Sequence, residues 1–479
     1  MKPCDVLIEG AWLIDGTGSE RRRSDIAVIG ERIVGIGDGQ QWQAKARIDA
    51  RDRVVAPGFI DAHTHDDRAV LSSPDMTPKI SQGVTTAIAG NCGVSLAPLA
   101  DHDPPPPLNL LGNREWYRFG SYEDYAESVE THPPALNIAT LVGHSTLRVG
   151  VMDDLARAAT PAEIDRMGKL LEKSLAAGCI GMSTGLAYPP AHAAPTDEIV
   201  ALAQHLVAYN GIYTTHMRDE RDGVVDSVEE TLEIGRRAGV RIVISHHKAC
   251  ARRNWGRTKE TLALISAAKK RQSVNLDVYP YIASSTVLLR DFVESSERVL
   301  LAWSEPHPEL AGRDFAGIKR DWDCSTEEAI TRLLPAGAIY YQMDEDDLRR
   351  VLSFDDAMIG SDGLPHDVFP HPRLWGTFPR VLGHYCRELG LFTLEEAVRR
   401  MTSVPAAVFG LKDRGTIREG AFADLVVFDP DAIIDRADFS RPKQPSAGIE
   451  LVLVNGQPVW RDTAWTGERP GRLLRRKSQ

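Results

Sequence analysis

The sequence predicts an α/β protein: a (β/α)8 TIM-like barrel with a small β-sandwich domain built from both chain ends. Three observations lead to this prediction. Through the middle of the chain, short apolar segments rich in β-branched residues alternate with amphipathic ones, as in parallel strands covered by helices. Eight such apolar segments can be counted, which is the number of strands in this barrel. Both chain ends instead contain β-rich segments broken by glycine-containing turns.

The barrel strands are expected at residues 54–61, 84–90, 137–142, 179–183, 212–215, 241–245, 274–279 and 357–361. Amphipathic stretches such as 161–177, 196–209, 223–238 and 259–271 lie between them. In barrels of this kind the active site lies at the carboxyl ends of the strands. Residues at those ends are therefore the first candidates for a functional site.

The two ends of the chain are expected to close into one small domain. We assign residues 1–56 plus 412–479 to this β-domain and residues 57–411 to the catalytic barrel. One connection within the barrel, 281–356, is too long for a simple loop. It predicts a lid insertion that covers the pocket or forms its wall.

Composition and net charge favour a soluble globular protein and argue against one that binds nucleic acid. Hydrophobic residues make up 43% of the chain and charged residues 26%, which is typical of a soluble globular protein. The formal net charge of −11 argues against a nucleic-acid partner. The one basic run, at residues 472–477, is expected to be a solvated terminus.

Cysteine usage and the N-terminus indicate the compartment. The six cysteines are scattered without paired spacing, which favours a reducing environment in which a lone cysteine can serve as a ligand. The N-terminus lacks the apolar region of a signal peptide, and no stretch reaches membrane-spanning length. We therefore expect a cytoplasmic enzyme that does not act at a membrane.

The end of the first barrel strand carries the motif Asp61-Ala62-His63-Thr64-His65. His63 and His65 point the same way because side chains of an extended chain alternate with a period of two. Two converging imidazoles suit a divalent metal. A pair of surface histidines would have the same spacing, so the motif needs support from elsewhere in the chain.

Four further strands end in residues of the same kind. Cys92 follows the second strand, His216 the fifth, His246 the sixth and Asp362 the eighth. Each has an ordinary alternative, such as a small buried cysteine or a core histidine. Their recurrence at one end of successive strands predicts a metal site. A thiolate and two imidazoles leave zinc one open position, which a catalytic zinc needs to bind water.

These strand ends resemble the amidohydrolase superfamily of metal-dependent hydrolases and, within it, the bacterial D-aminoacylases, or N-acyl-D-amino-acid deacylases. The similarity covers essentially the whole chain. Its carrying stretches are His63-Thr64-His65-Asp66-Asp67, Gly90-Asn91-Cys92-Gly93, Gly143-His144-Ser145, Ser183-Thr184-Gly185-Leu186-Ala187-Tyr188-Pro189-Pro190, Thr215-His216-Met217-Arg218, Ser245-His246-His247-Lys248, Tyr279-Pro280-Tyr281, Gly360-Ser361-Asp362-Gly363-Leu364-Pro365-His366 and His371-Pro372-Arg373-Leu374-Trp375-Gly376-Thr377-Phe378.

The fourth strand departs from the pattern of many superfamily members. Those members bridge two metals with a carboxylated lysine on this strand, but Cys179-Ile180-Gly181-Met182-Ser183 contains no lysine. In the D-aminoacylases a cysteine ending the second strand serves instead, and Cys92 occupies that position. The missing lysine also counts against the hydantoinase and dihydroorotase branches.

The resemblance implies zinc-dependent hydrolysis of N-acyl-D-amino acids to a carboxylate and a free D-amino acid. Cys92, His216 and His246 would hold one tightly bound zinc. His63 and His65 would approach a second, weaker metal position. The expected partner is the small-molecule substrate, without nucleic acid or membrane, and a monomer is expected.

The resemblance also assigns the remaining site residues. Zinc would polarise the amide carbonyl and generate hydroxide, and Asp362 would take the proton of the attacking water and return it to the leaving amine. The expected substrate-binding residues are Lys248, Tyr279 and Arg373 for the α-carboxylate, Tyr188 for the carbonyl, and Ser285, Tyr340 and Met343 in the pocket.

For the side chain of the substrate amino acid, the sequence supports two different expectations. Likeness to apolar-preferring members favours Met, Leu or Phe side chains, with Tyr340 and Met343 as pocket wall. The charged segment that begins at Arg290, and the pair Arg252-Arg253, favour D-aspartate or D-glutamate if they face the pocket. A cyclic amidase of the hydantoinase type and a barrel without catalytic activity are the further alternatives.

Overall fold

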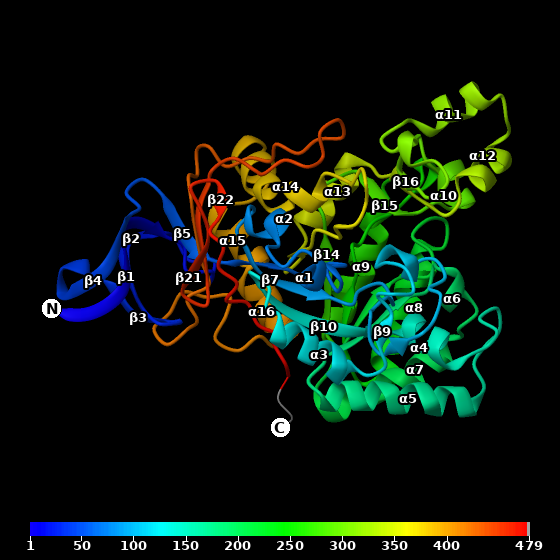
Figure 1. Cartoon of the computed structure of the whole chain (residues 1–479), viewed down its shortest axis with the longest axis horizontal. Coiled ribbons are helices and arrows are strands. Elements are labelled where there is room, and N and C mark those ends of the chain that lie inside the picture. The colour runs from blue at the N-terminus through cyan, green and yellow to red at the C-terminus, as the bar shows by residue number, and fades with distance from the viewer. Residues whose placement is uncertain (477–479) are drawn as a thin grey trace.

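Eight parallel strands form the barrel, in the order β18-β14-β13-β12-β11-β10-β7-β6 (Figure 1). The ring closes where the Ala62 N–H donates to the carbonyl of Ile359 at 3.2 Å. The predicted barrel is confirmed in this computed structural model, which describes residues 1–476. The strands are β6 (Phe59–Asp61), β7 (Val84–Ala89), β10 (Asn137–Gly143), β11 (Gly181–Gly185), β12 (Ile212–His216), β13 (Arg241–Ile244), β14 (Val274–Val278) and β18 (Met358–Ile359).

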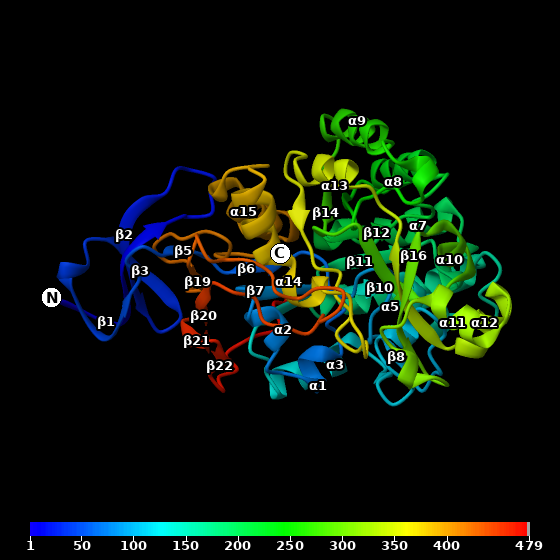
Figure 2. The same cartoon turned by 90° about the horizontal axis from the view of Figure 1, so that it is seen from above.

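Helices cover the outside of the barrel (Figure 2). The longest, α5 (Pro161–Ala176), begins with a capping box in which Thr160 and Glu163 satisfy each other's backbone N–H groups. The others are α1 (Ala69–Ser72), α2 (Thr77–Ile80), α3 (Tyr122–Thr131), α4 (His144–Val151), α6 (Pro189–His192), α7 (Thr196–Gln204), α8 (Val224–Ala238), α9 (Thr258–Lys269), α13 (Glu345–Leu352), α14 (Arg373–Arg380), α15 (Leu394–Met401) and α16 (Ser403–Phe409). A π-helical segment, η6 (Val381–Glu388), continues α14.

Both ends of the chain build one nine-stranded sheet, which confirms the predicted small β-domain. Its two parts meet where β5 pairs with both β1 and β19. Ile8, Val55 and Leu453 share its buried core. The strands are β1 (Lys2–Leu13), β2 (Arg22–Ile29), β3 (Arg32–Gly37), β4 (Trp42–Asp49), β5 (Val54–Pro57), β19 (Leu425–Phe428), β20 (Ile449–Val454), β21 (Gln457–Arg461) and β22 (Ala464–Trp465).

The segment predicted as one barrel strand, residues 54–61, is divided between the two sheets. The Gly58 N–H donates to Asp424 of the terminal region at 2.8 Å, whereas the next N–H, of Phe59, donates to Gly83 before β7 at 2.9 Å. A side chain at Gly58 would place its Cβ 2.1 Å from Thr85 Cγ2. Only glycine therefore fits where the chain passes from one sheet to the other.

The segment predicted as an irregular lid, residues 281–356, contains a small folded unit. A three-stranded antiparallel sheet of β15 (Ala283–Val287), β17 (Ala336–Tyr341) and β16 (Arg298–Ser304) carries α10 (Arg290–Ser295), α11 (Phe315–Trp322) and α12 (Thr326–Leu333). Leu301, Phe315 and Tyr340 belong to its separate core. This unit and the terminal sheet lie at opposite ends of the molecule (Figures 1 and 2).

The basic C-terminal run is not a solvated terminus over the part that the structure describes. Leu473 pairs with Ile138 in a parallel bridge, and Arg475 forms an ion pair with Glu130 at 2.9 Å. The two leucines between the basic residues bind the run to the barrel; Lys477 lies outside the described residues. No helix within residues 1–476 combines the length and apolar character needed to cross a bilayer.

Candidate metal centre and active site

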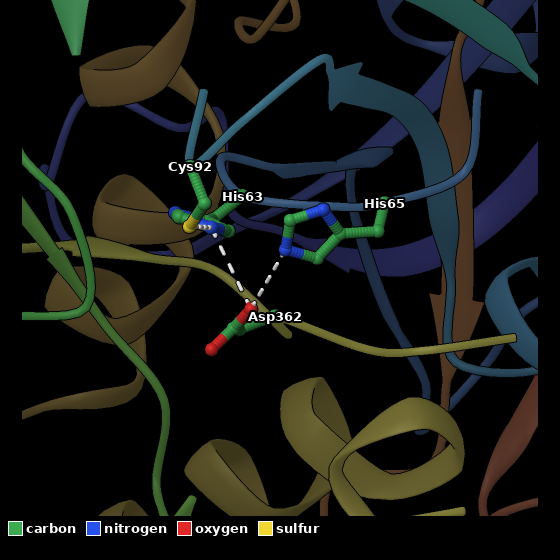
Figure 3. Close-up of side chains that lie close together, drawn as sticks. All are labelled: His63, His65, Cys92 and Asp362. Atoms are coloured by element: carbon green, nitrogen blue, oxygen red, sulfur yellow. Dashed lines mark hydrogen bonds and ion pairs between the residues drawn. The ribbon is translucent and has the colours of Figure 1, made fainter. Parts of the chain in front are cut away.

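His63 and His65 follow β6 and point into the carboxyl end of the barrel (Figure 3). Their ring centroids are 5.6 Å apart. His63 is completely buried, and its Nδ1 lies 3.3 Å from the carboxylate of Asp277 on β14. Because Asp277 engages Nδ1, the His63 Nε2 is the atom that faces Cys92, at 3.3 Å.

Cys92 lies between two groups of imidazoles. Its Sγ is 3.3 Å from His63 Nε2 and 3.3 Å from His246 Nε2. Burial alone would raise the pKa of the thiol, but His63 and His246 hold that pKa well below its usual range. A low thiol pKa favours the thiolate, which is the form that binds metal.

Three site residues have backbone conformations that place their side chains at tight turns. Cys92, His246 and Asp362 all have positive φ, at 53°, 37° and 49°. Such conformations cost free energy in residues with a side chain and are concentrated at functional sites. Each occurs just after a barrel strand, where the chain leaves the sheet and the side chain turns inward.

Two overlapping sets of side chains within residues 1–476 are close enough to bind a metal ion. One consists of Cys92, His216 and His246, and the other of His63, His65, Cys92 and Asp362. Both ring nitrogens of His216 are buried without a hydrogen-bond partner. Buried polar atoms are rarely left unpaired, so this imidazole fits a metal ligand. A sulfur and nitrogen donor set of this kind suits zinc.

Asp362 connects the histidines to a buried arginine. Its Oδ1 lies 3.2 Å from His65 Nε2, and its Oδ2 accepts from Arg373 Nη2 at 2.9 Å. Burial would raise the pKa of this carboxyl, but Arg373 and His63 hold it well below its usual range. Asp362 is therefore ionised and able to accept a proton.

Glu220 is a site residue that sequence reasoning missed. Its carboxylate is 2.7 Å from Lys248 Nζ and 3.1 Å from His246 Nδ1. Burial would raise its pKa, but Lys248 and His216 hold that pKa well below the usual range. The signal in the sequence was its position four residues after His216, just beyond the end of β12. Asp277 was also missed, although an aspartate within an apolar strand is unusual.

The catalytic cavity has about 450 Å³ of free space. It is lined by four of the five predicted metal ligands and by four of the eight other predicted site residues, namely Tyr188, Lys248, Ser285 and Asp362. Tyr279 and Met343 instead line a smaller cavity behind Lys248. Arg373 lies beside Tyr279, with its guanidinium 4.5 Å from the ring centroid.

Tyr340 does not line the catalytic cavity. Its hydroxyl donates to the Val287 carbonyl at 2.8 Å, and its ring lies behind Phe292, with 5.5 Å between the centroids. Phe292 is the residue that forms this wall. Arg290 points into solvent and pairs with Glu294 at 2.8 Å.

The charged residues near Lys248 also face solvent, since the side chains of Arg252 and Arg253 are largely exposed. Arg221 is closer to the site. It lines a small cavity that shares Phe292 and Gln342 with the catalytic one. Its Nη1 is buried without a partner, and its guanidinium lies 4.7 Å from the Phe292 ring centroid.

The sequence was compared with known families and proteins. A model of the amidohydrolase family matches residues 46–284 and 323–460. Three relatives come from Alcaligenes xylosoxydans xylosoxydans. A D-aminoacylase is 54% identical over 99% of this chain and 98% of its own length. An N-acyl-D-aspartate deacylase is 50% identical (98% and 95%), and an N-acyl-D-glutamate deacylase is 46% identical (98% and 96%).

Solved structures are similar over the same extent. A crystal structure of D-aminoacylase matches with a TM-score of 0.97 and 53% identity, covering 99% of this chain and 100% of that one. A further D-aminoacylase structure is described as having a binuclear metal centre, with one-metal activation and second-metal attenuation. An N-acyl-D-glutamate deacylase from Bordetella bronchiseptica, complexed with zinc and a phosphonate inhibitor, matches with a TM-score of 0.95 and 46% identity over 99% and 100% of the chains.

Proposed function

This chain belongs to the amidohydrolase family, and from that premise we propose that it hydrolyses N-acyl-D-amino acids to a carboxylate and a free D-amino acid. One observation carries the proposal. The ionised Asp362 belongs to one of the two metal-binding sets that share Cys92, and it also pairs with the guanidinium of Arg373. A base, a metal position and a carboxylate-binding cation are thus adjacent, as amide hydrolysis of an N-acyl amino acid requires.

The residues present fit a zinc ion, which Cys92, His216 and His246 would hold. Zinc bound there would supply a Lewis acid for the amide carbonyl and lower the pKa of a water molecule. His63 and His65 belong to the second set and would approach a weaker position. Glu220 contacts Nδ1 of His246, and Asp277 contacts Nδ1 of His63. These nitrogens face away from Cys92, so the two carboxylates fix the orientations of the rings.

Asp362 performs the proton transfers. It takes the proton of the attacking water as the water oxygen bonds to the amide carbon. When the C–N bond breaks, Asp362 returns this proton to the nitrogen, because an amide nitrogen leaves poorly until it is protonated. The low pKa of Asp362 keeps it ionised before the reaction.

The substrate α-carboxylate binds Arg373, Lys248 and Tyr279. The Nε and Nη1 groups of Arg373 are buried without protein partners, so two donors are free for an anion. Tyr188 orients the amide carbonyl. Burial and the nearby Cys92 raise the pKa of its hydroxyl well above the usual value, so it stays a neutral donor. Ser285 Oγ is also buried without a partner and is a further donor.

We propose apolar side chains, such as those of Met, Leu and Phe, as the preferred ones. The cavity has Val94, Leu110, Phe292 and Leu364 in its wall, and the carboxylate of Glu220 faces the same space. A second candidate, an acidic side chain, is favoured by the unpartnered Nη1 of Arg221. The kcat/KM values for N-acetyl-D-methionine and N-acetyl-D-glutamate decide between them. A glutamate preference that is lost in Arg221→Ala, but kept in the exposed Arg290→Ala control, would overturn the apolar proposal.

The activity itself is tested with the two enantiomers of N-acetylmethionine and with a hydantoin. We expect about one tightly bound zinc per chain and hydrolysis of the D-isomer. Turnover of the hydantoin in preference to the linear amide would indicate a cyclic amidase. Zinc-loaded protein that hydrolyses neither class would contradict the proposal.

A further inference from the structure

An apolar groove opens on the surface beside the catalytic cavity. It has about 840 Å³ of open space, and five segments line it, at residues 105–109, 155–156, 189–190, 287–289 and 334–336. None of its lining residues is charged, and Asn109 is the only one with a polar side chain. Apolar grooves of this size on a protein surface mark places where an apolar group binds.

Three of these segments contain or directly follow residues that line the catalytic cavity. Pro107 and Leu110 belong to the cavity, whereas Pro105 and Pro106 belong to the groove. In the same way Tyr188 lines the cavity, and Pro189, the next residue, lines the groove. The groove therefore adjoins the site along these segments.

Successive residues of β15 indicate on which side of the site the groove lies. The Ser285 carbonyl accepts from Arg373 at 3.1 Å, and the Thr286 hydroxyl is 2.9 Å from the hydroxyl of Tyr188. The next residue, Val287, lines the groove. Along this strand the carboxylate-binding arginine comes first, the carbonyl-orienting tyrosine second and the groove third. From Ser285 to Val287 is roughly 7 Å, so the groove begins on the acyl side of the scissile amide.

We propose that this groove binds the acyl chain of the substrate, so that the enzyme prefers N-acyl-D-amino acids with medium or long unbranched acyl chains over N-acetyl compounds. The inference rests on the proposed function. Leu110 and Leu289 pack against the cluster of Cys92, Tyr188 and Val287, so the wall between the metal position and the groove is apolar. Five prolines, whose φ is fixed, line the groove, so much of its wall is formed before a substrate arrives.

A hydrocarbon chain suits the groove better than a peptide segment. A peptide would bring backbone N–H and C=O groups, and the lining side chains offer only Asn109 as a partner for them. A hydrocarbon chain needs no such partners. Each methylene that is buried contributes through the hydrophobic effect alone.

The test measures kcat/KM for a series of N-acyl-D-methionines with acetyl, butyryl, hexanoyl and octanoyl groups, below their micelle concentrations. We expect kcat/KM to rise roughly two- to fourfold per methylene until the groove is filled. Leu334→Glu and Leu155→Glu, on two segments of the groove wall, should abolish this rise while N-acetyl-D-methionine is still hydrolysed as before. Leu389→Glu is the matched control, since Leu389 is 41% exposed, like Leu334 at 43%, and does not line the groove.

The failure of this inference is distinguishable from failure of the proposed function. Hydrolysis of N-acetyl-D-methionine with no rise along the series would overturn the acyl groove and leave the activity standing. A rise that persists in both groove variants would also overturn it. If the rise is absent and Leu334→Glu changes the oligomeric state in sedimentation, the groove is a contact between copies of the chain. Absence of hydrolysis for every acyl length would overturn the activity itself.

Discussion

Cys92 and Asp362 belong to the same cluster but are expected to fail in different ways when replaced. Cys92 is the one residue common to both metal-binding sets. Cys92→Ala should therefore lose the zinc and the activity together, measured by metal analysis and by hydrolysis of N-acetyl-D-methionine. Asp362→Asn should keep the tightly bound zinc and lose roughly 10²- to 10⁴-fold in kcat, since it removes only the proton-transfer group. Full zinc content in Cys92→Ala, or near-normal kcat in Asp362→Asn, would show that these assignments are wrong.

Glu220 positions two other site residues, and its replacement should affect metal affinity. Glu220→Gln keeps the shape but removes the negative charge that faces Lys248 Nζ and His246 Nδ1. Carboxylates that hold a metal-binding histidine in place typically contribute 10- to 100-fold to metal affinity. We expect zinc affinity, measured by competition with a chelator, to weaken by roughly this factor. Glu233→Gln, at an exposed ion pair with Arg236, is the control. Equal affinities in the two variants would contradict the role.

Asp367 gives a prediction for the pH dependence of stability. Burial raises the pKa of its carboxyl to about 7, although Arg373 lowers it in part. The unfolded carboxyl releases its proton near pH 4, so between these values the folded state binds more protons and stability falls as pH rises. Asp367→Asn should therefore stabilise the protein more at pH 8 than at pH 5, by about 1–3 kcal/mol. Denaturant unfolding at both pH values measures this. A pH-independent effect of Asp367→Asn would contradict it.

The insertion between β14 and β18 supplies one wall of the site. Ser284, Ser285, Thr286, Phe292 and Gln342 all line the cavity and all belong to it. Its separate core and its own sheet allow it to move as one body. We propose, as the length of the segment suggested, that it closes over bound substrate.

Hydrogen exchange with and without a phosphonate analogue of the substrate tests this closure. We expect slower exchange at 283–297 and at 336–342 when the analogue is bound. The small terminal sheet, at the other end of the molecule, serves as the internal control (Figure 1). Identical exchange of the insertion in both states would indicate a rigid wall.

The metal site joins strands from much of the barrel. The proposed ligands lie at or just after the ends of β6, β7, β12 and β13, so an ion bound there would tie together segments that are distant in the sequence. A ligand that binds only the folded state stabilises it, by about 2.7 kcal/mol at 100 times its Kd. Removal of zinc with a chelator should therefore lower the Tm, and added zinc should restore it. The Cys92→Ala variant should show no chelator effect; an equal effect there would place the stabilising ion elsewhere.

Much of the architecture follows from local patterns along the chain. The eight barrel strands, the β-rich ends and the gathering of His, Cys and Asp at the strand ends could all be predicted, because strand periodicity and the position of a residue after a strand are local properties. The extended segment at residues 54–61 could not be divided from the sequence, because its β-pattern is continuous through Gly58. The basic run at 472–476 was misjudged because its charges are a local property, whereas its burial depends on contact with Ile138, which is far away in the chain.

The sequence by itself determined the barrel, the ligand types and the kind of chemistry, since each depends on residues adjacent to a strand end. The tertiary structure alone decided which distant groups meet there. It brought Glu220 to Lys248 and His246, Asp277 to His63, and Phe292 rather than Tyr340 to the cavity wall. It also placed the apolar groove beside the catalytic cavity. The physical reason is that a contact between segments depends on how helices and strands pack, and packing is a property of the folded chain rather than of any stretch of it.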